Sequence, residues 1–351
     1  MMRERRTRWL VLSLVGLALM SYLCSVKAEN TLQPPVKLIW HYYKLNTTCP
    51  DAETYIKHQV KLFWQKDKSI TAKFLRLLSA DCLSKNRFLR NFGWKDSLKG
   101  CDGSILLDGR NSEKNAPQNQ GLEGFEEIDK IKIVLEDRCP GVVSCTDILN
   151  LATRDAAHLA GAPSYPVYTG RRDCLRTSID AVDFPSPSIS WQEGLAYFES
   201  KSLDVLDMAT LLGAHSMGKT HCSYIKDRLY NFNGTKKADP TMNKSLLKQL
   251  QKKCPKKSKT DPTVNLTPKS GNDYQFTGLY YSRILSKKAV LGIDQQLRFG
   301  DDTMQIAQEF APKSGFEDFR RSFALSMSRM GNIKVLTGKD GEIRRNCRRR
   351  N

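Results

Sequence analysis

The sequence predicts an all-α protein cross-linked by disulfides. Apolar residues recur at spacings of three and four along five segments, whereas the alternating pattern of strands is scarce. The 351 residues are enough for one large or two modest domains. Ten cysteines predict disulfides if the chain is exported, because an oxidising compartment converts thiols into cross-links. The expected helices are 52–66, 125–139, 142–161, 203–218 and 316–331.

The first 28 residues have the pattern of a secretory signal peptide. Four arginines between Arg3 and Arg8 precede the apolar run 9–23, and Val26-Lys27-Ala28 supplies small residues where a signal peptidase cleaves. The alternative is an uncleaved membrane anchor, but the run is shorter than the ~20 residues of a spanning helix. We therefore expect cleavage at about residue 28 and a secreted, extracellular protein formed by residues 29–351, without membrane attachment.

The charge and the sequons agree with export. The formal net charge is +19, concentrated in clusters such as 252–259 and 344–351. No aromatic residues interleave with these charges and no DNA-reading motif is present, which argues against nucleic acid as a partner. An acidic polysaccharide matrix is the expected partner; the alternative is a solvated basic surface that keeps the protein soluble. Four N-glycosylation sequons lie in polar stretches, at Asn46, Asn233, Asn243 and Asn265.

Breaks in the helical pattern divide the chain. Pro185 and Pro187, in the stretch DFPSPS, mark a boundary between two helical halves. The Lys-rich stretch 252–273 has little periodicity, so we expect it to form the longest loop.

The stretch FLRLLSADC, residues 74–82, places a cation on a largely apolar helix. On that helix Arg76 shares a face with Ser79 and Ala80, which is one turn further along. A long cation on a mostly buried helix requires an anionic or polar partner.

Two further segments carry candidate site residues. In LLGAHSMGK, His215 stands near the end of an apolar helix, and the small residues Gly213 and Ala214 before it allow a large flat group to approach the backbone. A lone histidine is more often a structural core residue than a ligand. In GIDQQL, however, Asp294 stands between apolar residues and needs a partner. An iron-binding histidine typically donates its second ring N–H to a carboxylate, so Asp294 is a candidate partner for His215.

Together these segments resemble a known family. From about residue 44 to residue 348 the chain resembles the class III secretory haem peroxidases of plants. The matching motifs, in order, are YYKLNTTCP, LRL with DC, GCDGSILLD, EKNAPQN, GFEEIDKIK, CPGVVSCTDIL, GRRD, FPSP, LLGAHSMGKTHC, DRLYNF, DQQL and MGNIKVLTGKDGEIRRNC. The resemblance implies the plant peroxidase fold, a monomer in which two helical halves enclose haem b. The distal half would span about 29–184 and the proximal half about 185–300, with 301–351 returning to the distal half.

The resemblance also implies roles for individual residues. His215 matches the proximal ligand of the haem iron, and Asp294 matches its carboxylate partner. Arg76 matches the distal arginine that stabilises charge on the departing peroxide oxygen. Asn119 matches the asparagine that orients the distal base, and Glu113 matches the acidic residue of the same network.

Position 80 departs from the family pattern. The family has histidine there, which moves a proton from the inner to the outer oxygen of hydrogen peroxide, and this chain has Ala80. Leu78 and Ser79 also replace the family's His and Phe. Alanine cannot move a proton, and general acid–base catalysis typically contributes about 10²–10⁴-fold in rate. We therefore expect the reaction with peroxide to be slowed by at least the upper end of that range.

The resemblance implies a distal calcium site, bound by carboxylate, carbonyl and hydroxyl oxygens. Its ligands would be Asp81, Gly100, Asp102 and Ser104. Between Cys82 and Cys101 lies an additional segment, 85–98, which is absent from the family's short disulfide loop. This segment is either a surface excursion or an artefact of sequence assembly.

A proximal calcium site is less well supported by the residues. Ser216 can replace the family's threonine, but Thr277 stands where an aspartate ligand is expected. Loss of a carboxylate weakens a calcium site. Either Asp273 compensates or the loop binds no ion.

The cysteines also match the family's framework. With Cys24 in the signal peptide, nine remain, and Cys174 is the one left without a partner. It is either a small buried hydrophobe or a reactive or intermolecular thiol. The implied pairs are Cys49 with Cys139, Cys82 with Cys101, Cys145 with Cys347, and Cys222 with Cys254.

The implied function is oxidation of phenolic donors by hydrogen peroxide, which removes peroxide under oxidative stress. Pro185 matches the proline whose carbonyl meets these aromatic substrates. Because of Ala80, two hypotheses follow. The first is a slow but working peroxidase. The second is an inactive haem-binding pseudoperoxidase that acts as a cell-wall binding protein.

Overall fold

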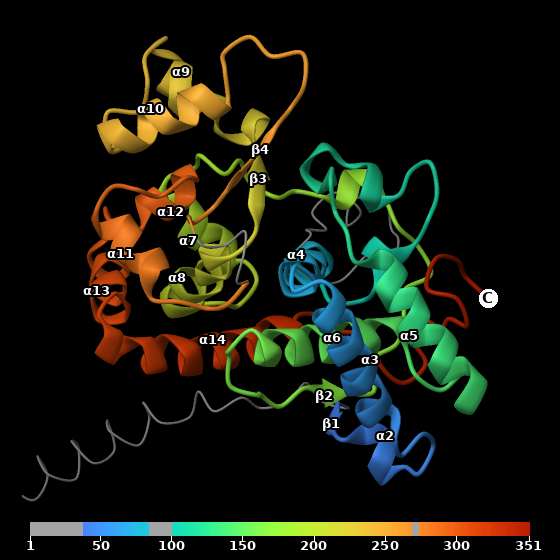
Figure 1. Cartoon of the computed structure of the whole chain (residues 1–351). Helices are drawn as coiled ribbons and strands as arrows, with labels where there is room; N and C mark the ends of the chain where they lie inside the picture. The colour runs from blue at the N-terminus through green and yellow to red at the C-terminus, as the bar shows by residue number, and fades with distance from the viewer. Residues whose placement is uncertain (1–37, 84–99, 269–273) are drawn as a thin grey trace, which may run out of the picture. The chain divides into compact units, whose positions relative to one another are not determined.

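The computed structural model describes residues 38–83, 100–268 and 274–351. In these residues helices dominate and the strands are two or three residues long (Figure 1), so the all-α prediction is confirmed. The predictions for the signal peptide, for the additional segment 85–98 and for Asp273 lie outside the described residues. Within the described ranges, no helix has the length and apolar character needed to cross a membrane.

The helices and strands follow in chain order. The first group of helices is α2 (Tyr42–Leu45), α3 (Ala52–Lys66), α4 (Ile70–Leu83), α5 (Phe125–Arg138) and α6 (Cys145–Leu159). The second group is α7 (Trp191–Glu199), α8 (Val205–Leu211), α9 (Lys226–Tyr230), α10 (Lys244–Lys253), α11 (Leu279–Leu285), α12 (Gly292–Gln296), α13 (Asp301–Phe310) and α14 (Phe316–Gly331). Strand β1 (Ile39–Trp40) pairs antiparallel with β2 (Tyr168–Thr169), and β3 (Lys219–His221) pairs antiparallel with β4 (Thr263–Asn265).

Helix α6 forms the centre of the first group. Its residues from Cys145 to Ala157 are all buried, because α3, α4 and α5 pack around it. A helix that is buried on all sides belongs to the core of a domain. The helix begins at Ser144, whose hydroxyl accepts the backbone N–H of Asp147. Helix α4, which carries Arg76, is therefore anchored by its packing against α6.

Helix α14 joins the two groups. It packs against α8 and also against α4, while α7 and α13 pack against α8 (Figure 1). Helix α8 begins with a capping box in which Asp204 and Asp207 each accept the other's backbone N–H. Helix α4, which carries Arg76, and helix α8, which leads to His215, are therefore both held against α14.

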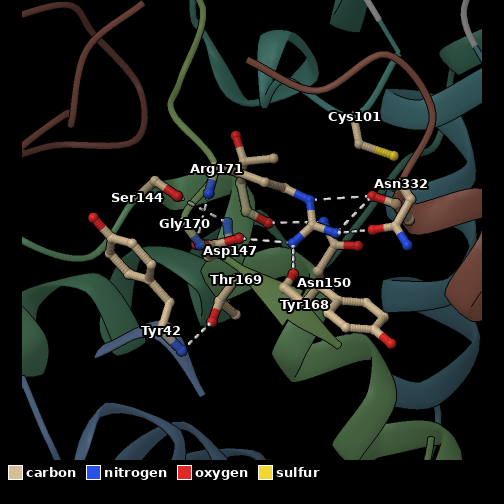
Figure 2. A network of polar contacts seen from close by, with 12 residues as sticks. Tyr42, Cys101, Ser144, Asp147, Asn150, Tyr168, Thr169, Gly170, Arg171 and Asn332 are labelled. Carbon is tan, nitrogen blue, oxygen red and sulfur yellow. Dashed lines mark hydrogen bonds and ion pairs between the residues drawn. The ribbon is translucent and has the colours of Figure 1, made fainter. Parts of the chain in front are cut away.

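A buried ion pair connects α6 to the end of α14. Arg171 Nη1 donates to Asp147 Oδ1 at 2.8 Å, and Arg171 Nη2 donates to the Gly331 carbonyl at 2.7 Å and to Asn332 Oδ1 at 3.0 Å (Figure 2). Asp147 Oδ2 also accepts the Tyr43 hydroxyl at 2.6 Å. Because both charges are buried and fully hydrogen-bonded, loss of either partner would leave the other uncompensated, which typically costs several kcal/mol.

Several expected bounds differ from the observed ones. The expected helix 203–218 ends as an α-helix at Leu211 and continues as a 3₁₀ helix over Leu212–Ser216. The expected loop 252–273 is wrong over part of its length, because α10 reaches Lys253 and β4 lies within it. Segments 52–66 and 316–331 are helices with the expected bounds.

The disulfide prediction is confirmed. Cys49 pairs with Cys139, Cys82 with Cys101, Cys145 with Cys347, and Cys222 with Cys254. Cys174 is a buried free cysteine. Its thiol donates to the Arg176 carbonyl at 3.0 Å, and burial raises the pKa of the thiol, which disfavours the reactive thiolate.

Candidate functional site

His215 and Asp294 form a hydrogen-bonded pair between two short helices. His215 Nδ1 lies 2.9 Å from Asp294 Oδ1, and the two residues are 79 positions apart in the chain. The histidine belongs to the 3₁₀ turn after α8, and the aspartate belongs to α12. Asp294 is buried, whereas the His215 side chain keeps 31% of its surface exposed. The contact therefore engages Nδ1 and leaves Nε2 available to a ligand.

Gly213 does not serve the purpose expected from the sequence. A Cβ atom at Gly213 would lie 2.6 Å from the Phe319 ring and 2.8 Å from the Tyr281 hydroxyl. The missing side chain makes room for these two buried aromatic residues, so the prediction that Gly213 admits a flat ligand is wrong. Ala214 is partly exposed and remains available to one.

Arg76 is held by the loop between α4 and α5. Its Nη2 donates to the Gln118 carbonyl at 2.8 Å and lies 3.5 Å from Asn119 Oδ1. Its guanidinium also lies 4.9 Å from the centre of the Phe184 ring. The surrounding protein lowers the pKa of Arg76 by desolvation, although the side chain is exposed to solvent.

Asn119 connects Arg76 to Glu113. Asn119 Nδ2 donates to the Glu113 backbone carbonyl at 2.9 Å, which orients its amide oxygen toward Arg76. The structure therefore brings together the three distal residues that the sequence analysis singled out. The asparagine faces the guanidinium in a site that has no histidine to orient.

Ala80 is completely buried in the hydrophobic core, whereas Ser79 is partly exposed. The Ser79 hydroxyl donates to the Arg76 carbonyl at 2.9 Å, which is a bond within the helix. Position 80 is thus closed to solvent as well as lacking a titratable group.

Two contacts bring the segment around Arg76 close to the segment around His215. A Cβ atom at Gly218, three residues after His215, would lie 3.6 Å from the Cβ of Ala72, one turn before Arg76. The Tyr224 hydroxyl donates to the Pro117 carbonyl at 2.8 Å, so the chain after β3 also meets the loop that holds Arg76. The segments that carry the partly exposed His215 and the exposed Arg76 therefore lie close together in the fold.

Sequence reasoning missed three contributors to this site. The Gln118 carbonyl and the Phe184 ring contact Arg76, and the Tyr280 hydroxyl donates to Asp294 at 2.9 Å. Phe184 directly precedes Pro185, which is partly exposed. No pattern in the sequence indicates the carbonyl contact, because any residue can supply it. The FPSP motif pointed to the neighbourhood of Phe184 without identifying the ring.

The predicted distal calcium ligands lie together in the interior. Asp81, Asp102 and Ser104 are buried, and Asp81 Oδ2 accepts the Gly103 N–H at 2.9 Å. Burial and the charge of Asp102 raise the pKa of Asp81 to about 8. Burial and the same two aspartates raise the pKa of Glu113. Such crowded carboxylates are stabilised by a cation.

The described residues supply only part of a distal calcium site. A Cβ atom at Gly100 would collide with the Ile333 carbonyl, so the position requires glycine. No three side chains of His, Cys, Asp or Glu converge on one point in the described part of the chain. A calcium ion here would rely on backbone and hydroxyl oxygens in addition to the two aspartates.

The proximal calcium ligands are only partly present. The Ser216 hydroxyl is buried and accepts or donates no hydrogen bond, which suits a ligand. The Ser216 carbonyl, however, accepts the Thr267 hydroxyl at 2.8 Å. Thr277 is partly exposed. Among the described residues, the partner of Ser216 is therefore a neutral hydroxyl and not a carboxylate.

Comparisons with known proteins agree with this geometry. The family model described as peroxidase matches residues 56–313. The chain is 63% identical over 341 residues to probable peroxidase 61 of Arabidopsis thaliana, covering 96% of this chain and 94% of that protein. It is 61% identical over 315 residues to probable peroxidase 26 of the same plant, with 89% of each chain covered. The chain belongs to the plant peroxidase family. Peroxidase 60 of that plant is a more distant relative, 40% identical with 88% of each chain covered.

Membership of the plant peroxidase family implies peroxidase activity and haem as cofactor, and the residues fit this cofactor. An axial ligand requires a histidine with one nitrogen engaged and the other accessible, and His215 satisfies both conditions. A haem peroxidase site also requires a positive charge to stabilise the departing peroxide oxygen, and Arg76, held by the Gln118 carbonyl, is a residue that could supply it. Position 80, where the sequence comparison predicts a proton-transferring histidine, is alanine.

Proposed function

We propose that this secreted protein oxidises phenolic donors with hydrogen peroxide, slowly, through a haem held by His215. The observation that carries the proposal is the His215–Asp294 hydrogen bond, which leaves the outer ring nitrogen accessible. Haem would supply the redox-active iron, and the remaining contributions come from the chain. Asp294 orients the imidazole and increases its basicity.

The chain's own residues would bind and polarise peroxide without relaying its proton. Arg76 is already fixed by Gln118 and Asn119, so its cation needs no reorganisation to stabilise negative charge on the departing oxygen. Ala80 offers no base, and the proton must be transferred by solvent. The loss is expected to be about 10⁴-fold in rate, the upper end of typical acid–base contributions.

Phenolic donors are proposed to bind near Pro185. Phe184 presents its ring beside Arg76, and the neighbouring Pro185 is partly exposed. An aromatic ring next to a carbonyl-bearing turn provides an apolar contact and a hydrogen-bond acceptor for a phenol.

The first prediction concerns activity. Reconstituted with haem and purified from unbound haem, the protein should show a Soret band and oxidise guaiacol in a peroxide-dependent reaction faster than free haem. His215→Ala should lose both properties. His221→Ala is the matched control, because His221 is partly exposed and contacts Asp261, and it should keep both.

An alternative function follows if the haem-loaded protein is no more active than free haem. That result would exclude the peroxidase and support the pseudoperoxidase. The burial of Ala80, which closes the position of the base, is the observation that favours this second candidate. Absence of a Soret band would exclude both.

We further propose that the distal region binds calcium. Burial and the charge of Asp102 raise the pKa of Asp81, and burial and both aspartates raise the pKa of Glu113, which supports this site. Asp81, Asp102, Ser104 and the Gly100 carbonyl would be the protein ligands.

Calcium should stabilise the chelator-treated protein against thermal unfolding. At a concentration 100 times its Kd the gain is about 2.7 kcal/mol. Asp102→Asn should remove most of this gain, whereas Asp108→Asn, the same change at an exposed carboxylate, should retain it. Equal responses of the two variants in calorimetry would contradict the proposed site.

We also propose that an acidic cell-wall polysaccharide binds residues 219–268, here called the basic segment. It contains twelve Lys and Arg residues against three Asp and no Glu, a formal net charge of +9. Arg228 and Asp239 form a buried pair at 2.7 Å, which leaves eleven lysines. Ten of them are exposed, and none forms an ion pair within the described residues. The Cys222–Cys254 disulfide and the β3–β4 pair connect the two ends of this segment.

A stripe of lysines on α10 offers a test. Lys244, Lys248 and Lys252 are exposed and spaced by four, so they lie on one face. Changing all three to Gln should lower the salt concentration at which the protein leaves a polygalacturonate column. The matched control changes the exposed Lys57, Lys61 and Lys66 of α3 to Gln, an equal loss of charge.

The control triple variant should leave the column close to wild type. If both triple variants leave the column at an equally reduced salt concentration, retention depends only on the net charge of the protein. Passage of the wild-type protein at low salt without retention would overturn the polysaccharide proposal.

A further inference from the structure

A second hydrogen bond reaches the oxygen that orients His215. Asp294 Oδ1 accepts His215 Nδ1 at 2.9 Å and also the Tyr280 hydroxyl at 2.9 Å. Tyr280 lies in the first turn of α11 and is 3% exposed, and Asp294 is 2% exposed. The three side chains therefore form a chain of hydrogen bonds that ends in the protein interior.

The tyrosine must be the donor in its contact. Burial and the charge of Asp294 raise the pKa of the Tyr280 hydroxyl well above its usual value, so the hydroxyl keeps its proton. A donor that occupies a carboxylate oxygen withdraws part of its negative charge. Less charge then remains to attract the Nδ1 proton of His215, and hydrogen bonds in such networks depend on one another.

We propose that Tyr280 is a positioning residue that limits how strongly Asp294 polarises His215. The inference rests on the proposed role of His215 as axial ligand. An imidazole that is less strongly polarised donates less electron density to the iron, because the partner of a ligating histidine determines its basicity. Removing the hydroxyl should therefore stabilise the oxidised iron and lower its midpoint potential.

Tyr281 provides an internal control. It is the next residue of α11 and is completely buried, and its ring packs edge-on against that of Tyr280 with centroids 4.9 Å apart. Its hydroxyl donates to the Ala209 carbonyl at 3.1 Å and not to Asp294. Tyr281→Phe thus removes a buried hydroxyl and one hydrogen bond from the same helix without changing the acceptor of His215.

The first measurement uses the haem-free protein. Proton NMR should show the Nδ1 proton of His215 moving downfield in Tyr280→Phe, because loss of the competing donor strengthens the His215–Asp294 bond. The same resonance should remain near its wild-type position in Tyr281→Phe. No shift, or equal shifts in the two variants, would overturn the proposal.

The second measurement uses the haem-loaded protein. Spectroelectrochemical titration should give a lower midpoint potential in Tyr280→Phe than in wild type or Tyr281→Phe, and resonance Raman of the ferrous form should show a higher iron–histidine stretching frequency. Equal potentials in the two variants would overturn the proposed tuning. If wild type shows no iron–histidine band at all, the proposed role of His215 fails, and that outcome is distinguished from failure of the Tyr280 hydrogen bond by the NMR result.

Discussion

The hydrogen bond between His215 and Asp294 is the contact on which the site depends. It joins a 3₁₀ turn to α12 and determines which ring nitrogen is available. A free imidazole could rotate and present either nitrogen, and an unpaired buried carboxylate would be costly. The hydrogen bond fixes the orientation of the imidazole and gives the carboxylate a partner. The packing of α14 against α8 and α4 holds the His215 segment in place relative to α4.

The distal side keeps its cation but has lost its base. Gln118, Asn119 and Phe184 restrain Arg76 even though no histidine is present at position 80. A fixed guanidinium stabilises developing charge, but its very high pKa prevents it from exchanging protons at neutral pH. On the proposed function, the two catalytic contributions that the family combines are therefore separated in this chain.

Much of the fold could be predicted from the sequence, because amphipathic periodicity determines long helices locally. Segments 52–66 and 316–331 have the predicted bounds. The end of α8 could not be predicted, since Phe319 and Tyr281, which pack against Gly213, come from distant segments. The same reason explains the missed contacts of Gln118 and Tyr280. The residues themselves singled out Arg76, His215 and Asp294, whereas the remaining site residues and the cysteine pairs came from the family resemblance, and periodicity alone would have left His215 as a core histidine.

The most direct test of the account is the second-order rate constant for the reaction of the haem-loaded protein with hydrogen peroxide, compared between wild type and Ala80→His. Position 80 is buried, and because side chains on a helix extend over the preceding turn, an imidazole introduced there would lie over the turn that carries Arg76. We predict an increase of about 10²- to 10⁴-fold. A haem-loaded Ala80→His variant that reacts no faster than wild type would contradict the claim that only the base is missing.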